Sequence, residues 1–138
     1  MENLIRTIIK ETLDEMELRY SNEGNLFFLT MCSPKATFRI HIIADDSKEL
    51  FAIVGHYPVN VPKARLGDMY GVANYINREM RAAKVVIDPE DGELTMRVIA
   101  NADSDAINKE VFTACIGEII YYLEDKYDEI MMAMFSGE

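Results

Sequence analysis

Cysteine is scarce in this sequence, and its two copies are not arranged for a bridge or a metal. Cys32 and Cys115 lie far apart, each inside an apolar run, and neither has a second cysteine or a histidine at ligand spacing. This excludes a disulfide framework and a C-x-x-C motif. We expect two reduced, buried thiols, with a disulfide between them as the alternative.

Long apolar runs are also missing. The first 20 residues alternate charged and apolar side chains from the second position, so they contain no signal-peptide core. The chain has no apolar span of 18 residues. We therefore expect a protein of the reducing cytoplasm that has no membrane contact.

Positive charge is in deficit. Lysine and arginine number 14 against 24 acidic residues, which gives a formal net charge of -10. A nucleic-acid partner is not expected, because such binding needs a basic surface that displaces counterions. Residues 102–138 carry nine acids against two lysines, and thus seven of the ten net charges. We interpret this acidity as the solvated face of a helix, with a binding patch as the alternative.

Motifs for catalysis or cofactor binding do not occur. His41 and His56 are the only histidines, and neither has a cysteine or a second histidine at i+2 or i+4, so we interpret both as structural. The chain has no G-x-S-x-G elbow, G-x-G-x-x-G loop or Walker loop. We therefore expect a protein that is not an enzyme and binds no cofactor. Carboxylates that meet only in the folded chain remain an alternative source of a site.

Acidic residues cluster around a glycine at 88–93, in the sequence DPEDGE. In the calcium loop of helix-loop-helix proteins the glycine stands at position 6 and a glutamate at position 12. Counted from Asp88, Gly92 falls at position 5 and position 12 is not acidic. Pro89 and the Asp91-Gly92 pair are typical turn residues, so the segment predicts a hairpin turn. A metal site is the weaker alternative.

The 138 residues fit one domain, 1–138, in which apolar spacing predicts eight elements. Steps of three and four predict helices over 2–20, 63–82 and 105–135, the last with Ser104 among its candidate N-caps. Alternation or short apolar runs predict strands over 26–32, 37–43, 50–57, 85–87 and 94–100, with residues 21–25 as a turn. The order α-β-β-β-α-β-β-α indicates an α+β fold, a mainly antiparallel five-stranded sheet with packed helices.

The strand at 26–32, LFFLTMC, is apolar on both faces. A sheet with one wet face should alternate, so we expect its second face to be covered by a helix of the same chain, another subunit or a partner peptide. The last helix also ends in methionines, which adapt to varied partners and fill gaps in cores. The candidate partner or dimer surface comprises six residues: Phe27, Leu29, Met31, Met131, Met132 and Met134.

Four features of the sequence carry a resemblance to a known family. They are the Val61-Pro62 entry to the middle helix, Asn77 within YINREM, the Asp-Gly-Glu turn at 91–93 and the last helix ending in Ser136-Gly137. The chain resembles the YbjN family of small bacterial proteins, described as sensory transduction regulators. The resemblance implies the fold of type III secretion chaperones, which are small, acidic, usually homodimeric proteins that bind unfolded protein segments. No catalytic residues are defined for either group.

From these features we expect a non-enzymatic, cytoplasmic protein-binding module that acts as a homodimer in bacterial regulation or stress response. A secretion chaperone that binds an effector segment is the alternative. An acidic metal-binding protein or enzyme is the second alternative.

Overall fold

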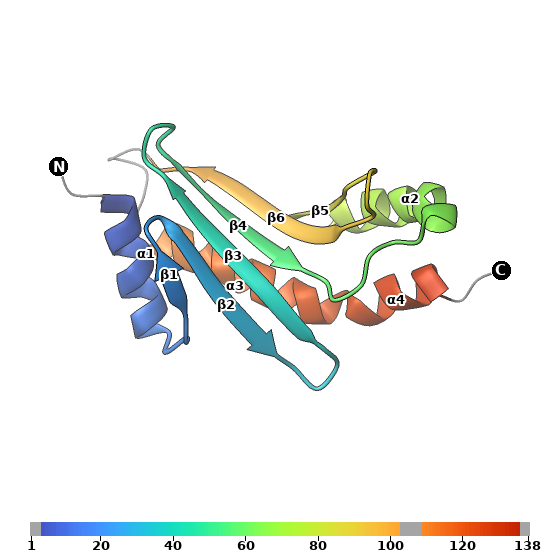
Figure 1. Ribbon diagram of the computed structural model, residues 1–138, viewed down its shortest axis with the longest axis horizontal. Helices are drawn as coiled ribbons and strands as arrows, with labels where there is room; N and C mark the ends of the chain where they lie inside the picture. Colours follow the sequence, from blue (N-terminus) through green and yellow to red (C-terminus); the bar gives the residue numbers. More distant parts are fainter. Residues whose placement is uncertain (1–3, 103–108, 136–138) are drawn as a thin grey trace.

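The computed structural model describes residues 4–102 and 109–135 of the 138-residue chain. Its elements occur in the expected order, with two additions that are explained below (Figure 1). The candidate N-cap Ser104 lies outside the described residues. The elements are α1 (Leu4–Glu15), β1 (Ser21–Glu23), β2 (Leu26–Cys32), β3 (Thr37–Asp45), β4 (Leu50–His56), a 3-10 turn η1 (Lys63–Arg65), α2 (Leu66–Asn77), β5 (Lys84–Ile87), β6 (Leu94–Asn101), α3 (Lys109–Asp125) and α4 (Tyr127–Phe135).

The described strands form one antiparallel sheet in the order β1-β2-β3-β4-β6-β5. The α+β fold class is confirmed, but the sheet has six strands where we expected five. The added strand, β1, lies where we expected only a turn. Gly24 adopts a φ of +59°, which lets the chain reverse there and pairs Ser21–Glu23 with β2.

Two helices are shorter than their apolar spacing predicts. α1 ends at Glu15, because Glu17 takes a positive φ of 58° and the amide of Leu18 bonds back to the carbonyl of Leu13. α2 ends at Asn77, beyond which the Lys84 ammonium binds the carbonyls of Asn77 and Met80. In both places the end of the helix is set by contacts that the spacing alone does not contain.

The last helix is interrupted, whereas we expected one helix over 105–135. α3 ends at Asp125 and α4 begins at Tyr127. The buried hydroxyl of Tyr57 donates to the carbonyl oxygen of Leu123 at 3.0 Å, inside the last turn of α3. A side chain that takes a helix carbonyl in this way interrupts the hydrogen-bond ladder and bends the helix.

The four α-helices of the described residues pack on one side of the sheet. In Figure 1, α3 passes behind the strands, with α1 to the left and α2 and α4 to the right. The inner face of the sheet and the helices share one apolar core. Its largest fully buried side chains are Phe27, Phe38, Phe51, Phe112, Ile9, Leu13, Ile40, Ile42, Ile53, Met69, Ile76 and Leu94. The other face of the sheet has no helix over it in this part of the chain.

The acidic segment at 88–93 forms the turn between β5 and β6, as expected. The carboxylates of Asp88 and Asp91 accept the backbone N–H groups of Glu90 and Glu93, each at 2.8 Å. Gly92 takes a φ of +78°. Two of the clustered acids therefore shape the turn by bonding its backbone.

Candidate functional site

The uncovered side of the sheet is the candidate site, and we call it the open face. Residues directly opposite each other in an antiparallel pair point to the same side, so the strand register defines its members. They are Ser21 and Glu23 on β1, Leu26, Phe28, Thr30 and Cys32 on β2, Thr37, Arg39, His41, Ile43 and Asp45 on β3, Leu50, Ala52, Val54 and His56 on β4, Lys84 and Val86 on β5, and Thr95, Arg97, Ile99 and Asn101 on β6.

One row of the open face is apolar from strand to strand. Leu26, Ile43, Ala52 and Ile99 are aligned across β2, β3, β4 and β6. Ile43 is 40% exposed and Ile99 is 68% exposed. The half-buried Ala52 lies between these two isoleucines. Exposed apolar side chains joined by an apolar row are typical of a surface that binds protein.

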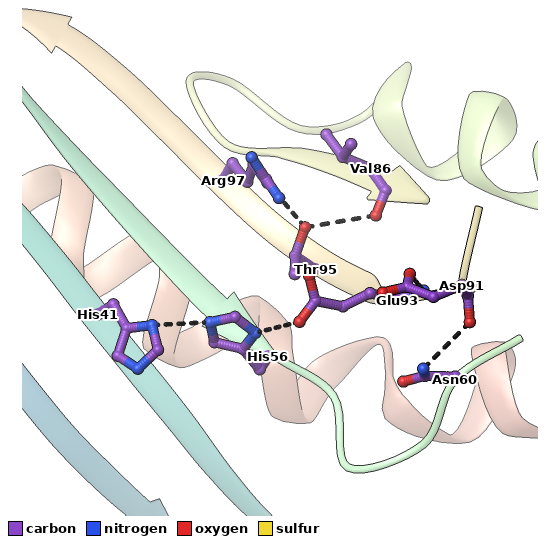
Figure 2. A network of polar contacts seen from close by, with 8 residues as sticks. All are labelled: His41, His56, Asn60, Val86, Asp91, Glu93, Thr95 and Arg97. Atoms are coloured by element: carbon purple, nitrogen blue, oxygen red, sulfur yellow. Dashed lines mark hydrogen bonds and ion pairs between the residues drawn. The ribbon is translucent and has the colours of Figure 1, made fainter. Parts of the chain in front are cut away.

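Next to the apolar row, three polar side chains form a continuous chain across the face (Figure 2). His56 Nε2 lies 3.0 Å from His41 Nδ1, and His56 Nδ1 lies 3.2 Å from the Glu93 carboxylate. His41 also packs edge-on against the Phe28 ring, with ring centroids 5.2 Å apart. β3, β4 and the β5–β6 turn together position this polar chain.

The pKa of His41 is lowered from its usual value. Partial burial is the largest cause, followed by the neighbouring His56 and Arg39, while Glu93 acts in the opposite direction. His41 is therefore held toward its neutral form in the isolated protein.

Arg97 is oriented by a buried hydroxyl beside this chain (Figure 2). Its Nε donates to Thr95 Oγ1 at 2.9 Å, and Thr95, which is 1% exposed, donates to the Val86 carbonyl at 3.4 Å. The hydrogen bond to Thr95 thus holds the Arg97 side chain in place at its Nε, over β6.

The six residues of the expected partner or dimer surface do not lie together on one surface. Phe27, Leu29 and Met134 are buried in the core, with exposed fractions of 0%, 7% and 2%. Our choice of face on β2 is corrected here, because the chain's own helices cover Phe27 and Leu29, while Leu26 and Phe28 point to the open face. Met31 and Met131 are partly buried against the core, and Met132 is exposed.

The cysteines also differ from the expectation of two buried thiols. Cys115 is buried in α3, and burial raises the pKa of its thiol. Cys32 is exposed. It is the last residue of β2, where it pairs with Thr37 on the open face.

The open face was missed at the sequence level, although part of its signal was visible. Thr37, Arg39 and His41 alternate with apolar residues and so mark one side of β3 as accessible. Its apolar row was not recognisable, because it joins single residues from four strands whose register comes only from pairing.

Two hollows lie on the helix side of the molecule. One, of about 590 Å³, separates the β2–β3 turn from α3, and the other, of about 540 Å³, lies between α3 and the segment after α2. Both are lined in part by Tyr121, and neither contains a histidine.

Within residues 4–102 and 109–135, no group of three histidine, cysteine or acidic side chains is placed to hold a metal ion. In the same residues, no helix is both long enough and apolar enough to cross a membrane.

A scan against protein families matches the family described as "YbjN: Putative bacterial sensory transduction regulator", over residues 6–131. No curated protein sequence matches the chain.

Solved structures with a similar fold include two complexes. The crystal structure of the ExsC–ExsE complex matches with a TM-score of 0.61 at 12% identity, covering 89% of this chain and 90% of the other. The HopA1–SchA chaperone–effector complex matches with a TM-score of 0.61 at 10% identity, covering 89% and 93%.

A third similar structure carries the family's name. YbjN from E. coli, described as "a putative transcription regulator", matches with a TM-score of 0.59 at 12% identity, covering 94% of this chain and 88% of that one. The fold is thus shared with a chaperone–effector complex, as the resemblance implied.

Proposed function

Since the chain belongs to the YbjN family, we propose that it is a non-enzymatic protein-binding module that acts through the open face. It works in the cytoplasm as one domain, in bacterial regulation or stress response. The observation that carries the proposal is the apolar row of Leu26, Ile43, Ala52 and Ile99, of which the two isoleucines are exposed beside charged side chains. Protein interfaces combine an apolar centre with polar groups in this way.

The test compares protein capture by three forms of the full chain. Phe28→Asp combined with Ile43→Asp places two charges on the open face, and Asn74→Asp adds a charge at an exposed position of α2. Immobilised wild type and Asn74→Asp should retain the same proteins from a bacterial lysate, and the double variant should lose them. Circular dichroism checks that the double variant is folded. Equal capture by all three forms would contradict a role for the open face.

The homodimer is a second part of the proposal, with α4 as its contact. Met132 is 68% exposed and Phe135 is 60% exposed, next to the partly buried Met131. Such a group of large apolar side chains at one end of the molecule is suited to pair with its own copy.

Light scattering on a sizing column tests the dimer. The wild type should elute with twice its monomer mass of 15.8 kDa, and Met132→Asp should shift toward the monomer. Asn74→Asp adds the same charge to an exposed position of α2 and should leave the dimer intact. A wild-type monomer at high micromolar concentration would rule the dimer out.

A secretion chaperone is the second candidate function. Its support is that two similar structures are complexes, one of them a chaperone with its effector. The two functions differ in the bound form of the partner. A chaperone of this kind binds a segment of its partner that is unfolded, so the captured protein should become protease-resistant only over the bound segment. A partner that binds as a folded domain would favour the regulator.

A further inference from the structure

The positive charge of the open face is unusual for so acidic a chain. The formal net charge is -10, yet the middle of this face carries Arg39 and Arg97. Lys84 stands on the edge strand β5, and its ammonium already binds the carbonyls of Asn77 and Met80. Glu93, which reaches this face from the β5–β6 turn, already bonds His56. The acids of the face itself, Glu23 and Asp45, lie in the apolar row and beyond it. A partner that covers these cations must supply negative charge, since burying them unpaired is costly.

The basic positions and the apolar row are adjacent, at a fixed spacing. On β3, His41 and Ile43 are two residues apart and point to the same side. Two residues of extended chain span about 7 Å. An extended segment that lies along the strands therefore matches both positions when an apolar side chain and a carboxylate stand two residues apart.

The His41–His56–Glu93 chain limits how many protons this site can hold. A contact of 3.0 Å between His56 Nε2 and His41 Nδ1 requires one proton between the two nitrogens. Glu93 is ionised and accepts a hydrogen bond from His56 Nδ1. When both imidazole rings are neutral, His41 Nε2 therefore carries no proton and can only accept a hydrogen bond. Within the described residues Nε2 makes no hydrogen bond.

One added proton changes the exposed nitrogen of the His41–His56 pair from a hydrogen-bond acceptor to a donor. It can bind at His41 Nε2, while the proton between the rings moves toward His41 or His56 and the positive charge stays near Glu93. His41 Nε2 then becomes a charged donor. A second added proton would put two N–H groups face to face and break the 3.0 Å contact.

We propose that the open face binds an extended protein segment in which an apolar side chain and a carboxylate stand two residues apart, and that binding takes up one proton at the His41–His56 pair. The inference rests on the proposed function of the open face and names the class of its partner. The apolar side chain lies on the row of Ile43, and the carboxylate lies over His41 and Arg39.

The sign of the pH dependence follows from the groups around His41. β3 contributes Arg39, β4 contributes His56 and the β5–β6 turn contributes Glu93, while β2 presents the uncharged Phe28 ring. On β6, Arg97 stands in the same row beyond Val54. A bound carboxylate adds a negative charge to this set and raises the pKa of His41. Affinity then rises as pH falls, by at most tenfold per pH unit for one proton.

The first experiment selects random dodecapeptides displayed on phage against the wild-type protein at pH 6. A parallel selection uses the folded Phe28→Asp, Ile43→Asp double variant. Peptides specific to the wild type should carry an apolar residue and an Asp or Glu two positions apart. If no peptide distinguishes the two proteins, the proposed function of the open face fails. Specific peptides without acids, or rich in lysine and arginine, would overturn the inference alone.

The second experiment follows the best selected peptide by calorimetry between pH 5.5 and 8. The Kd of this peptide should fall by up to tenfold for each unit by which the pH is lowered. Titrations in buffers of different ionisation enthalpy should show that binding takes up as much as one proton. His41→Gln should bind with no pH dependence, while Arg39→Gln should weaken binding at every pH. Arg19→Gln, at an exposed position outside the open face, is the charge-matched control.

Three results would overturn the inference. They are binding without proton uptake, uptake of two protons, and tighter binding of a single-stranded DNA 12-mer than of the selected peptide. The last would assign the cations to nucleic acid.

Discussion

Asn77 closes one edge of the sheet with its side-chain amide. Its Oδ1 accepts the N–H of Val85 at 2.6 Å, and its Nδ2 donates to the carbonyl of the same residue at 3.1 Å. The amide therefore stands where a neighbouring strand would, and this gives a structural reason for the asparagine within YINREM. Covered edges prevent unwanted strand pairing.

Replacing Asn77 tests this role. Asn77→Ala leaves both backbone groups of Val85 without their partner and should lower the free energy of unfolding by about 1–3 kcal/mol. Asn74→Ala, at an exposed position of the same helix, should change it by less than about 0.5 kcal/mol. Urea unfolding measures both. Equal effects of the two substitutions would show that the bonds of Asn77 add no stability.

Gly92 is required by both its backbone and its neighbour. Its φ is +78°, and a Cβ at this position would lie 2.2 Å from the carbonyl oxygen of Val61. Gly92→Ala should therefore cost more than about 2 kcal/mol. Gly71→Ala should instead stabilise by about 0.5–1 kcal/mol, because its Cβ would meet nothing within 4 Å on a helix. Thermal melts of the pair should move in opposite directions.

At the scale of elements, the sequence was most informative where one residue pattern determines one strand. The spans 26–32, 37–43, 50–57 and 94–100 agree with β2, β3, β4 and β6 to within two residues at each end. β1 was missed because Ser21–Glu23 has no apolar pattern and becomes a strand only by pairing with β2. The ends of α1 and α2 were misjudged for a related reason, since distant or irregular bonds set them.

Tyr57 links β4 to the break between α3 and α4. Tyr57→Phe removes the hydroxyl that binds the Leu123 carbonyl and should cost about 1–2 kcal/mol in unfolding free energy. Tyr121→Phe, which changes a 61% exposed ring, should be close to neutral. Chemical denaturation of both variants checks this. A neutral Tyr57→Phe would mean that the break in the helix does not depend on this bond.

At the scale of the whole molecule, the fold class and the excess of apolar sheet surface could be predicted from the sequence, but the face that stays uncovered could not. Phe27 and Phe28 are adjacent and equally apolar, and nothing local tells which one the helices cover. The contacts among His41, His56 and Glu93 could not be predicted from the sequence either. The two histidines meet through strand pairing, and Glu93 joins them from a turn. Their sequence spacing carries no sign of this contact.

The stability of the whole molecule should depend on pH through His41. Its folded-state pKa lies below the usual 6.5, so the unfolded chain binds more protons as the pH falls. This contribution to stability is complete above about pH 6.5 and is lost as the pH falls toward the folded-state pKa. The urea midpoint should drop more between pH 7.5 and 5.5 in the wild type than in His41→Gln. The same drop in both would contradict this role of His41.

The capped edge at β5 also decides how far the sheet can grow. With the Val85 backbone bonded to Asn77, β1 is the edge left for another strand to join. Among the described strands, two copies that pair through β1 would each use their one uncapped sheet edge and leave none for a third. Growth of the sheet by strand pairing would therefore stop at two copies.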